Sequence, residues 1–450
     1  MDAMEQKIIA WIDEHRDEII EDFKTLVKTE SQTGNEYNAQ QIVKKHLEKT
    51  GALVDMWDPD IKEIFEKYPD VAQFPTRFEP EYDLVLKVAD KCTYEQLINS
   101  EYKDILNYKN RPNVVGTIKG TGGGRSLMFN DHIDTVTIGD RSLWTRDPLG
   151  AQEEGDRVYG RGAADTKAGV TAMLYVLRVM NELNIKLRGD LMASSVVNEE
   201  HAGNGTLGVL ARGYKADAVI VADNYSYDRM IYATGGNVTW EIKILGRQRH
   251  TGNRWENGEM MGISAVEKTP AIINALLNLE KEANLDGIKM NMGIDVINGG
   301  DYHTATAAEC TIKGVIYFDA KLGAGVEGIN EIKQKLIDTV KEACVGDEWL
   351  TQNPPQVYMT HYDDAYEFHA DRAIIDEIMQ AGRDTLGIEI QQMRCSASDV
   401  RHWGNTGNMP AVVYGAGNGP CAHAIDEWNS KDDIINATKV MAITAYRWCK

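Results

Sequence analysis

Apolar positions at helical spacing open the chain, and segments typical of strands follow them. One apolar stripe runs through the first thirty residues and predicts amphipathic helix there; it comprises Ile8, Ile12, Ile19, Phe23, Leu26 and Val27. A further helix is expected over residues 36–50, because Gly51 follows it in the place of a typical C-terminal cap. A strand is expected over residues 52–57. Residues 58–112 contain five prolines and no clear periodicity, and this pattern predicts an insertion in the fold.

Three apolar segments of strand character each end on side chains that can take part in chemistry. The first ends at His132 and Asp134, the second at the adjacent pair Glu199 and Glu200, and the third at Asp223. The carboxyl ends of the strands in an open α/β sheet form the usual ligand crevice. The pattern therefore predicts an α/β domain whose functional site gathers these side chains.

The hydrophobic pattern changes near residue 231. Apolar and polar residues alternate from Val238 to Ile244, which is typical of a strand with one solvated face. Helices are expected over residues 262–283 and 328–343, and a further strand over residues 311–318. Together they predict a layer of helices on one sheet. We therefore expect a catalytic domain over residues 1–230 that includes the 58–112 insertion, an inserted α+β lid domain over 231–346, and the second part of the catalytic domain over 347–450.

Composition and charge narrow the class of protein. The 450 residues include 48 Lys and Arg against 69 Asp and Glu, a net charge of −21, which disfavours nucleic acid or an anionic membrane as a partner. No apolar segment has the length of a membrane span, and residues 1–7 lack the form of a signal peptide. The six cysteines have no CxxC spacing, so neither a disulfide framework nor a thiolate zinc site is indicated. A cytoplasmic protein is expected.

Histidine and carboxylate side chains at these positions suit metal binding. His132 can bind a cation through one ring nitrogen while a carboxylate accepts a hydrogen bond from the other. Glu199 and Glu200 point to opposite sides if their backbone stays extended, so that one can bind metal while the other faces a substrate water. Simpler roles stay open for each residue, namely hydrogen bonding in a loop, a solvated acidic turn and, for Asp165 before an apolar run, capping of a helix.

Six signatures together make the chain resemble a known family of metallohydrolases. The family contains the aminoacylases, glutamate carboxypeptidase, acetylornithine deacetylase and succinyl-diaminopimelate desuccinylase. The signatures occur in the order and approximate spacing of that family, and the resemblance covers nearly the whole chain apart from residues 58–112. They are His132-x-Asp134, Gly160-Arg-Gly-x-x-Asp165, Glu199-Glu200, Asp223, Gly246-x-x-x-His250 and His423-x-x-Asp426-Glu427.

The resemblance implies a zinc-peptidase fold, in which helices cover a mixed α/β sheet, and a centre of two divalent metal ions. Zinc is the expected metal, with cobalt and manganese as alternatives. By this resemblance the metal ligands are His132 and Asp223 for one ion, Glu200 and His423 for the other, and Asp165 as a bridge between them. Glu199 would be the general base, and Asp134 would orient His132. The peptide bond after the bridging aspartate is often cis in the family, so a cis bond is expected between Asp165 and Thr166.

The same resemblance implies a homodimer that forms through the lid domain. In the family a lid histidine, here His250, reaches the active site of the partner and stabilises the oxyanion. A polar loop residue without this role is the alternative for His250. The expected partners are thus a second copy of the chain and a small-molecule substrate.

The chain departs from the family where many members bind a substrate carboxylate. Thr304 stands in the place of an Asn, and the strand expected over residues 311–318 contains no Arg, with Lys313 as its only cation. Arg and Lys are not equivalent at a bidentate carboxylate site. Arginines elsewhere could substitute, namely Arg401, Arg247, Arg249 and Arg254. The segment 299–301, Gly-Gly-Asp followed by an aromatic residue, resembles a subgroup of deacylases and deformylases.

Three functions therefore compete. The first is metal-dependent hydrolysis of a small N-acyl substrate by a deacylase or deformylase. The second is dipeptidase or carboxypeptidase activity of the same residues, and the third is non-catalytic binding on the same fold. Loss of the base or of a ligand would favour the third function, but all signature positions are filled. The first is preferred because a site for a free carboxylate normally supplies an Arg.

Overall fold

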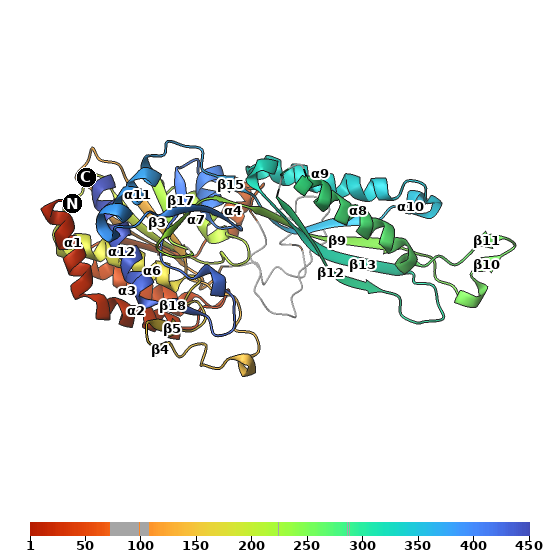
Figure 1. Cartoon of the computed structure of the whole chain (residues 1–450), viewed down its shortest axis with the longest axis horizontal. Coiled ribbons are helices and arrows are strands. Elements are labelled where there is room, and N and C mark those ends of the chain that lie inside the picture. The colour runs from red at the N-terminus through yellow and green to blue at the C-terminus, as the bar shows by residue number, and fades with distance from the viewer. Residues whose placement is uncertain (73–98, 100–107, 224, 286, 288) are drawn as a thin grey trace. The chain divides into compact units, whose positions relative to one another are not determined.

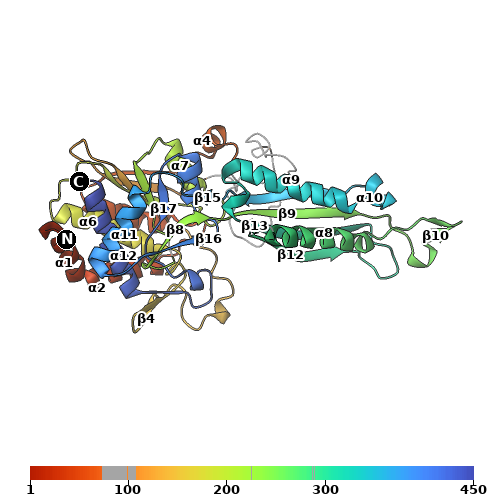
Figure 2. The ribbon, with the colours of Figure 1, turned by 45° about the horizontal axis from the view of Figure 1, so that its top comes forward.

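The structure is a computed structural model that describes residues 1–72, 99, 108–223, 225–285, 287 and 289–450. Most of the insertion predicted over residues 58–112 therefore lies outside the described residues. The chain divides into two compact units, which Figure 1 and Figure 2 show from two directions. Unit 1 comprises the described residues of 1–233 together with 368–450, and unit 2 comprises those of 234–367.

Unit 1 is built on a mixed β-sheet. Its neighbouring strands are, in order, β1 (Leu53–Trp57), β2 (Asn113–Ile118), β6 (Leu191–Val196), β3 (Leu127–His132), β7 (Ala218–Val221), β17 (Ala411–Val413) and β8 (Arg229–Thr234), and β16 (Gln391–Cys395) also pairs with β8. β3 is parallel to both β6 and β7, and β7 is parallel to β17, whereas the pairs β1–β2, β2–β6 and β17–β8 are antiparallel. Every residue of β3, β6 and β7 is buried, as expected for central strands whose two faces are covered.

The helices of unit 1 pack on this sheet and on one another. They are α1 (Ala3–Glu14), α2 (Arg16–Lys28), α3 (Tyr37–Lys49), α4 (Ile61–Lys67), α6 (Lys167–Glu182), α7 (Asn204–Ala211), α11 (Ala373–Leu386) and α12 (Lys431–Trp448). α6 contacts β3 and β6 and is almost wholly buried, α12 lies against α6, and α7 contacts β2 and β6. A small separate sheet pairs β18 (Trp428–Ser430) with β5 (Arg157–Tyr159), and β5 with β4 (Gln152–Glu154).

The apolar stripe of the first thirty residues is divided between two helices. α1 begins with a capping box, in which Asp2 accepts hydrogen bonds from the N–H groups of Met4 and Glu5 while the Glu5 carboxylate accepts one from the N–H of Asp2. All the apolar residues of the predicted stripe are buried. The helical prediction is confirmed, with a break at His15 between α1 and α2.

Unit 2 consists of helices on an antiparallel sheet. Its strands are, in order, β12 (Met290–Gly299), β13 (Glu309–Phe318), β9 (Gly236–Leu245) and β14 (Gln356–Asp363). α8 (Ala265–Leu285) contacts β9, β12 and β13, and α9 (Gly325–Ala343) contacts β9 and β14. Short elements complete the unit, namely β10 (Trp255–Glu256), β11 (Glu259–Met260) and α10 (Glu348–Gln352). β15 (Tyr366–Glu367), at the end of this stretch of the chain, is by its pairing the last strand of the mixed sheet, next to β8.

Unit 2 ends at residue 367, whereas the sequence pattern placed the end of the lid domain at residue 346. The reason is β14, which pairs with β9 and so continues the sheet of this unit beyond α9. The alternation predicted for β9 is present, because its apolar side chains Val238, Trp240, Ile242 and Ile244 are all buried.

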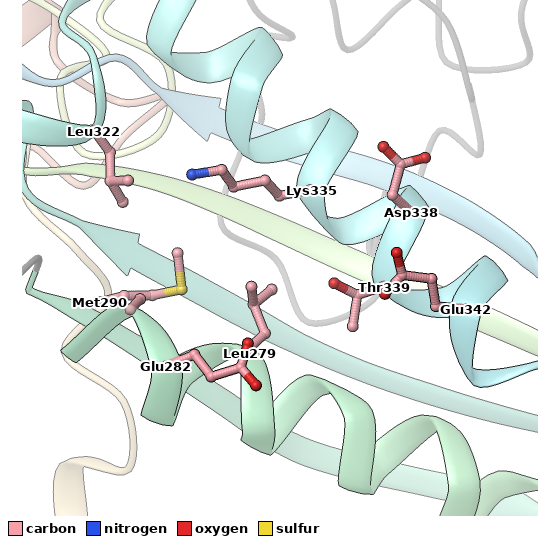
Figure 3. A pocket seen from close by; sticks show the side chains of 9 residues that line it. Leu279, Glu282, Met290, Leu322, Lys335, Asp338, Thr339 and Glu342 are labelled. Atoms are coloured by element: carbon pink, nitrogen blue, oxygen red, sulfur yellow. The ribbon is translucent and has the colours of Figure 1, made fainter. Parts of the chain in front are cut away.

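A hollow lies between α8 and α9 of unit 2, and Figure 3 shows it from close by. Apolar and charged side chains line it together, among them Leu279, Met290, Leu322, Glu282, Lys335 and Asp338. None of its lining residues is one of those predicted for catalysis.

The fold class follows from these elements. Helices cover a mixed sheet in unit 1, and a second unit of α+β type interrupts it in the sequence. The predicted α/β class with an inserted α+β domain is therefore confirmed. Among the described residues, no helix is both long enough and apolar enough to cross a lipid bilayer.

Candidate metal centre and active site

The candidate site lies where three neighbouring strands of unit 1 end. β3 ends at His132, the turn after β6 carries Glu199 and Glu200, and Asp223 follows β7. β3 lies between β6 and β7 and is parallel to both. Their carboxyl ends therefore open at one edge of the sheet, which is the usual place of a ligand site in such folds.

Asp165 lies between two histidines. Its Oδ1 is 3.0 Å from Nε2 of His132, and its Oδ2 is 3.1 Å from Nε2 of His423. The same nitrogen of His423 is 3.0 Å from Oε2 of Glu200. Ligand atoms of His132, Asp165 and Glu200 all lie within 4.8 Å of one another. Asp165 is thus placed to share its two oxygens between two sites, one beside each histidine.

This donor set fits divalent cations. Nε2 of His132 is buried, and among the described residues no group forms a hydrogen bond with it, although Oδ1 of Asp165 is close. The two atoms can therefore face a common ion. All the donors are imidazole nitrogens or carboxylate oxygens, which zinc, cobalt and manganese accept as ligands. Cys421, two residues before His423, instead donates through Sγ to the carbonyl oxygen of Trp428.

Negative charge is concentrated in the site. The adjacent carboxylates of Asp165 and Glu200 raise the pKa of His423 to about 11. Burial and the charge of Asp165 raise the pKa of Asp223 to about 7, and burial also raises the pKa of Glu200. Such a field favours bound cations, because positive charge removes the repulsion among the carboxylates.

Glu199 stands beside these groups. Its Oε2 is 3.9 Å from Nε2 of His132, and its main-chain N–H donates a hydrogen bond of 3.1 Å to Oδ1 of Asp134. Burial raises the pKa of Glu199 well above its usual range, and the charges of Asp399 and Asp223 raise it further. A buried carboxyl group with a raised pKa beside candidate metal ligands is a candidate for a catalytic acid or base.

Asp134 supports both His132 and the turn of Glu199. It is wholly buried, and its Oδ2 accepts a hydrogen bond of 2.7 Å from the hydroxyl of Thr33. Nδ1 of His132 is 2.9 Å from the main-chain carbonyl oxygen of Asp134 but 3.7 Å from its Oδ1. When Nδ1 donates to this carbonyl, Nε2 is left with the free lone pair. The orienting contact thus comes mainly from the carbonyl oxygen of Asp134 and less from its carboxylate.

A buried ion pair holds the loop that carries Asp165. Nη1 of Arg161 is 2.5 Å from Oε2 of Glu427, and the other carboxylate oxygen accepts hydrogen bonds from the N–H groups of Ala164 and Asp165. Nη2 of Arg161 donates to the carbonyl oxygen of His423 at 3.3 Å. One ion pair therefore positions the backbone of two predicted ligands. Glu427 stood in the last sequence signature, but its role is visible only through these contacts.

Thr166 and Asp131 form a second link, which no motif in the sequence indicates. The peptide bond between Asp165 and Thr166 is cis, as expected, and Thr166 rather than Asp165 is the N-cap of α6. The Thr166 hydroxyl donates to Oδ2 of Asp131 at 3.3 Å, and the N–H of His132 donates to its Oδ1 at 3.0 Å. This buried contact joins the segments that carry His132 and Asp165.

His250 belongs to unit 2, whereas all the other predicted site residues belong to unit 1. Its side chain is exposed, and its Nδ1 accepts a hydrogen bond of 3.1 Å from the N–H of Gly252. With Nδ1 as acceptor, the neutral ring carries its proton on Nε2 and can donate it in a hydrogen bond to an anionic oxygen.

A cluster of histidines and carboxylates at the strand ends of a mixed α/β sheet is typical of metal-dependent hydrolases. Comparison with known families agrees with this class, because the model of "Peptidase family M20/M25/M40" matches residues 128–447. The chain belongs to this family, and it is a metal-dependent hydrolase of linear amide bonds. The family resemblance carried by the six signatures is thereby confirmed.

Relatives of known activity include two deformylases. The N-formyl-4-amino-5-aminomethyl-2-methylpyrimidine deformylase of Bacillus subtilis (strain 168) is 30% identical over 366 residues, which cover 76% of this chain and 84% of that protein. The protein of the same name from Halalkalibacterium halodurans is 25% identical over 470 residues, which cover 99% of this chain and 97% of that protein.

Solved structures resemble the whole chain at lower identity. Human carnosine dipeptidase 1 has a TM-score of 0.67 at 16% identity, and the match covers 100% of this chain and 99% of that chain. A dinuclear metal-binding peptidase of the M20 family from Bacillus subtilis has a TM-score of 0.60 at 13% identity, and the match covers 97% of this chain and 99% of that chain. These likenesses support the fold class described above.

Proposed function

We propose that the protein is an amide hydrolase of deacylase or deformylase type, which releases an acyl or formyl group from a small N-acyl amine at a centre of two divalent metal ions. The observation that carries the proposal is the position of Asp165 between two histidines, with Glu199 beside them. In this proposal the ligands are His132 and Asp223 for one ion, Glu200 and His423 for the other, and Asp165 for both. Zinc, or else cobalt or manganese, would when bound there polarise the scissile carbonyl and lower the pKa of a water molecule.

Glu199 moves the proton in this mechanism. Its carboxylate accepts a proton from the attacking water and donates it to the nitrogen of the leaving amine, so that the amine leaves as a neutral molecule. The hydrogen bond from its N–H to Asp134 fixes the main chain beside the carboxylate. Nε2–H of His250 donates to the oxyanion that forms on the former carbonyl oxygen.

The arginines near His250 are already engaged by other groups, which supports a substrate without a carboxylate on its amine side. Arg254 donates to both carboxylate oxygens of Glu267, at 2.8 and 2.6 Å. Arg249 forms an ion pair of 2.7 Å with Glu256. Arg247 donates to two main-chain carbonyl oxygens, those of residues 260 and 261.

The two further cations considered from the sequence also have protein contacts. Nζ of Lys313 is 3.5 Å from Oε2 of the buried Glu241, and the buried Arg401 donates to the carbonyl oxygen of Ser398 at 3.2 Å. The substrate named for the two deformylase relatives carries its formyl group on an aminomethylpyrimidine. We therefore place the substrate of this protein among N-acyl or N-formyl amines.

Activity is expected to be independent of a free carboxylate next to the leaving amine. For an N-acyl amine and its carboxylated analogue, kcat/KM should be similar, or higher for the former. The variant Arg254→Gln serves as a control, and it should change kcat/KM for both substrates by the same factor. A loss of roughly a hundredfold on removal of the carboxylate, which corresponds to about 2.7 kcal/mol of transition-state binding, would instead establish the dipeptidase or carboxypeptidase hypothesis.

We further propose that unit 1 is the catalytic domain and that unit 2 is the lid through which a cytoplasmic homodimer forms. His250 supports the proposal, because it is exposed on unit 2 with Nε2 available as a donor. The described cysteines, which are Cys310, Cys344, Cys395, Cys421 and Cys449, are all free, as is usual in a reducing compartment.

Mixing two inactive variants should restore activity if His250 acts across the dimer. His250→Ala and Glu199→Gln protomers, exchanged in equal amounts, form hybrid dimers in which one of the two sites has both intact residues. The recovered rate should approach roughly a quarter of that of the unmodified protein, because half of the dimers are hybrids. Subunit exchange is verified by native mass spectrometry, and exchange without recovery would mean that each site is complete within one chain.

A further inference from the structure

Glu199 is carried by a tight turn between β6 and α7, and Asn198 is the residue that sets this turn. Asn198 is wholly buried and has a φ of +66°. Its carbonyl oxygen accepts hydrogen bonds from the N–H groups of Ala202 and Gly203, at 3.2 and 2.8 Å. Because Asn198 directly precedes Glu199, its conformation determines the direction in which the Glu199 side chain leaves the main chain.

The hydroxyl of Tyr108 reaches this turn from behind. Oη of Tyr108 donates a hydrogen bond of 2.6 Å to Oδ1 of Asn198, and both side chains are buried. The side-chain amide of Asn113 binds the main chain on either side of the same turn. Its oxygen accepts a hydrogen bond from the N–H of Val197, and its nitrogen donates one to the carbonyl oxygen of Gly205. The turn of Glu199 is thus fixed at both of its ends and at Asn198.

Arg111 and Glu36 hold the ring of Tyr108 in place. The guanidinium of Arg111 lies 4.8 Å from the centre of the ring and donates to both carboxylate oxygens of Glu36, at 2.6 and 2.9 Å. Arg111 and Glu36 are 1% and 0% exposed, so solvent does not weaken this bidentate pair. Glu36 also accepts a hydrogen bond from the N–H of Gly34. The tyrosine therefore has a rigid support.

Tyr108 and Arg111 belong to the segment between β1 and β2 whose two ends are joined. Trp57 at the end of β1 pairs with Asn113 at the start of β2, and the N–H of Asn110 donates to the Asp58 carboxylate at 3.0 Å. Tyr108 and Arg111 precede the part of the chain that the family model matches, residues 128–447. The hydroxyl that contacts Asn198 thus comes from outside the range that the family model matches.

We infer that Tyr108 is a positioning residue for catalysis, which acts through Asn198 to hold Glu199 in the direction that proton transfer requires. The inference rests on the proposed role of Glu199 as the base. In this inference Tyr108 acts on Glu199 through Asn198 and not on the substrate. Its loss should therefore lower the rate of the chemical step and leave substrate binding and metal content unchanged.

The test compares Tyr108→Phe, which removes only the hydroxyl, with Glu199→Gln and with the double variant. With N-formyl-4-amino-5-aminomethyl-2-methylpyrimidine as the assay substrate, Tyr108→Phe should lower kcat roughly 5- to 50-fold, because small misplacements of a reacting group cost rate steeply. KM and the number of bound metal ions should stay within about twofold of those of the unmodified protein. In the Glu199→Gln background, the same substitution should lower kcat no further.

Tyr175→Phe is the matched control. It removes a tyrosine hydroxyl that donates a hydrogen bond of the same length, 2.6 Å, to Asp22, and it should leave kcat unchanged. Asn198→Gly removes the acceptor of the Tyr108 hydroxyl while it tolerates the φ of +66°. It should reproduce the loss, so that the inference can be tested even if one variant does not fold.

Three results would overturn the inference: an unchanged kcat in Tyr108→Phe, the same loss in Tyr175→Phe, or an equal further loss in the Glu199→Gln background. Full activity of Glu199→Gln itself would instead refute the proposed base. The two failures are therefore distinguishable in one set of measurements.

Discussion

Replacing Glu199 by Gln is expected to lower kcat by roughly 10²- to 10⁴-fold, because the proton acceptor is lost while size and hydrogen-bonding reach are kept. The main-chain hydrogen bond to Asp134 does not depend on the side chain, so the turn should keep its shape. The content of divalent metal should persist as well, because Glu199 is proposed as the base and not as a ligand. Steady-state kinetics and elemental analysis of the same preparation measure both quantities.

Glu18→Gln provides the control for this experiment. Glu18 forms an ion pair with Arg178 and is 48% exposed, so the same chemical change there should leave kcat within about twofold, as for most surface substitutions. Near-normal turnover of Glu199→Gln would remove Glu199 from the mechanism. Loss of metal together with activity would show that Glu199 is a metal ligand instead of the general base.

Removing a metal ligand is expected to abolish activity. His132→Ala and His423→Ala should each lower the number of bound divalent ions below two, because each imidazole is proposed to hold a different ion and only Asp165 is shared. A fall of roughly 10³-fold or more in kcat should accompany the loss, since both ions serve the same carbonyl and water. Inductively coupled plasma mass spectrometry of protein purified without chelator gives the count.

Reconstitution completes this test. Protein stripped by a chelator should regain activity with zinc, cobalt or manganese, and His303→Ala, which removes an exposed histidine of unit 2, should keep both metal and activity. Protein that carries no metal and is not activated by any of the three ions would refute the proposed centre.

The local pattern of apolar and polar residues was sufficient to predict that the candidate site residues lie together at the ends of strands. Strands that are covered on both faces leave long apolar runs, and β3, β6 and β7 are buried throughout. Each run stops where polar side chains begin, so the positions of His132, Glu199 and Asp223 relative to the sheet follow once the strands are taken as parallel neighbours. The order of the six signatures then leads to the family, which the comparisons confirm.

Supporting contacts could not be foreseen in the same way. The ion pair between Arg161 and Glu427 joins residues 266 positions apart in the sequence. The hydrogen bond from Thr33 to Asp134 joins residues 101 positions apart. Hydrophobic period and turn chemistry describe at most a few neighbouring residues. Long-range pairs of this kind depend on how the elements pack, which no local pattern encodes.

Unit 2 shows the same division. The alternation of β9 and the helical periods of α8 and α9 were readable from the sequence, and all three elements are present. The sequence pattern did not predict β14. The end of the unit at residue 367 follows from the pairing of β14 with β9. An edge strand is recognised by its partner more than by its own composition, because only one side of it is paired.

The sequence by itself determined the kind of chemistry and the places along the chain where it could occur, because imidazoles and carboxylates at strand ends have few other uses in such number. Only the tertiary structure decided which atoms meet. It turned Nε2 of His132 toward Asp165 by giving Nδ1 the carbonyl oxygen of Asp134, and it brought Tyr108 to Asn198 across 90 positions of the chain. Both outcomes have one physical reason: buried polar groups must find partners, and the packing of distant elements determines which partners are within reach.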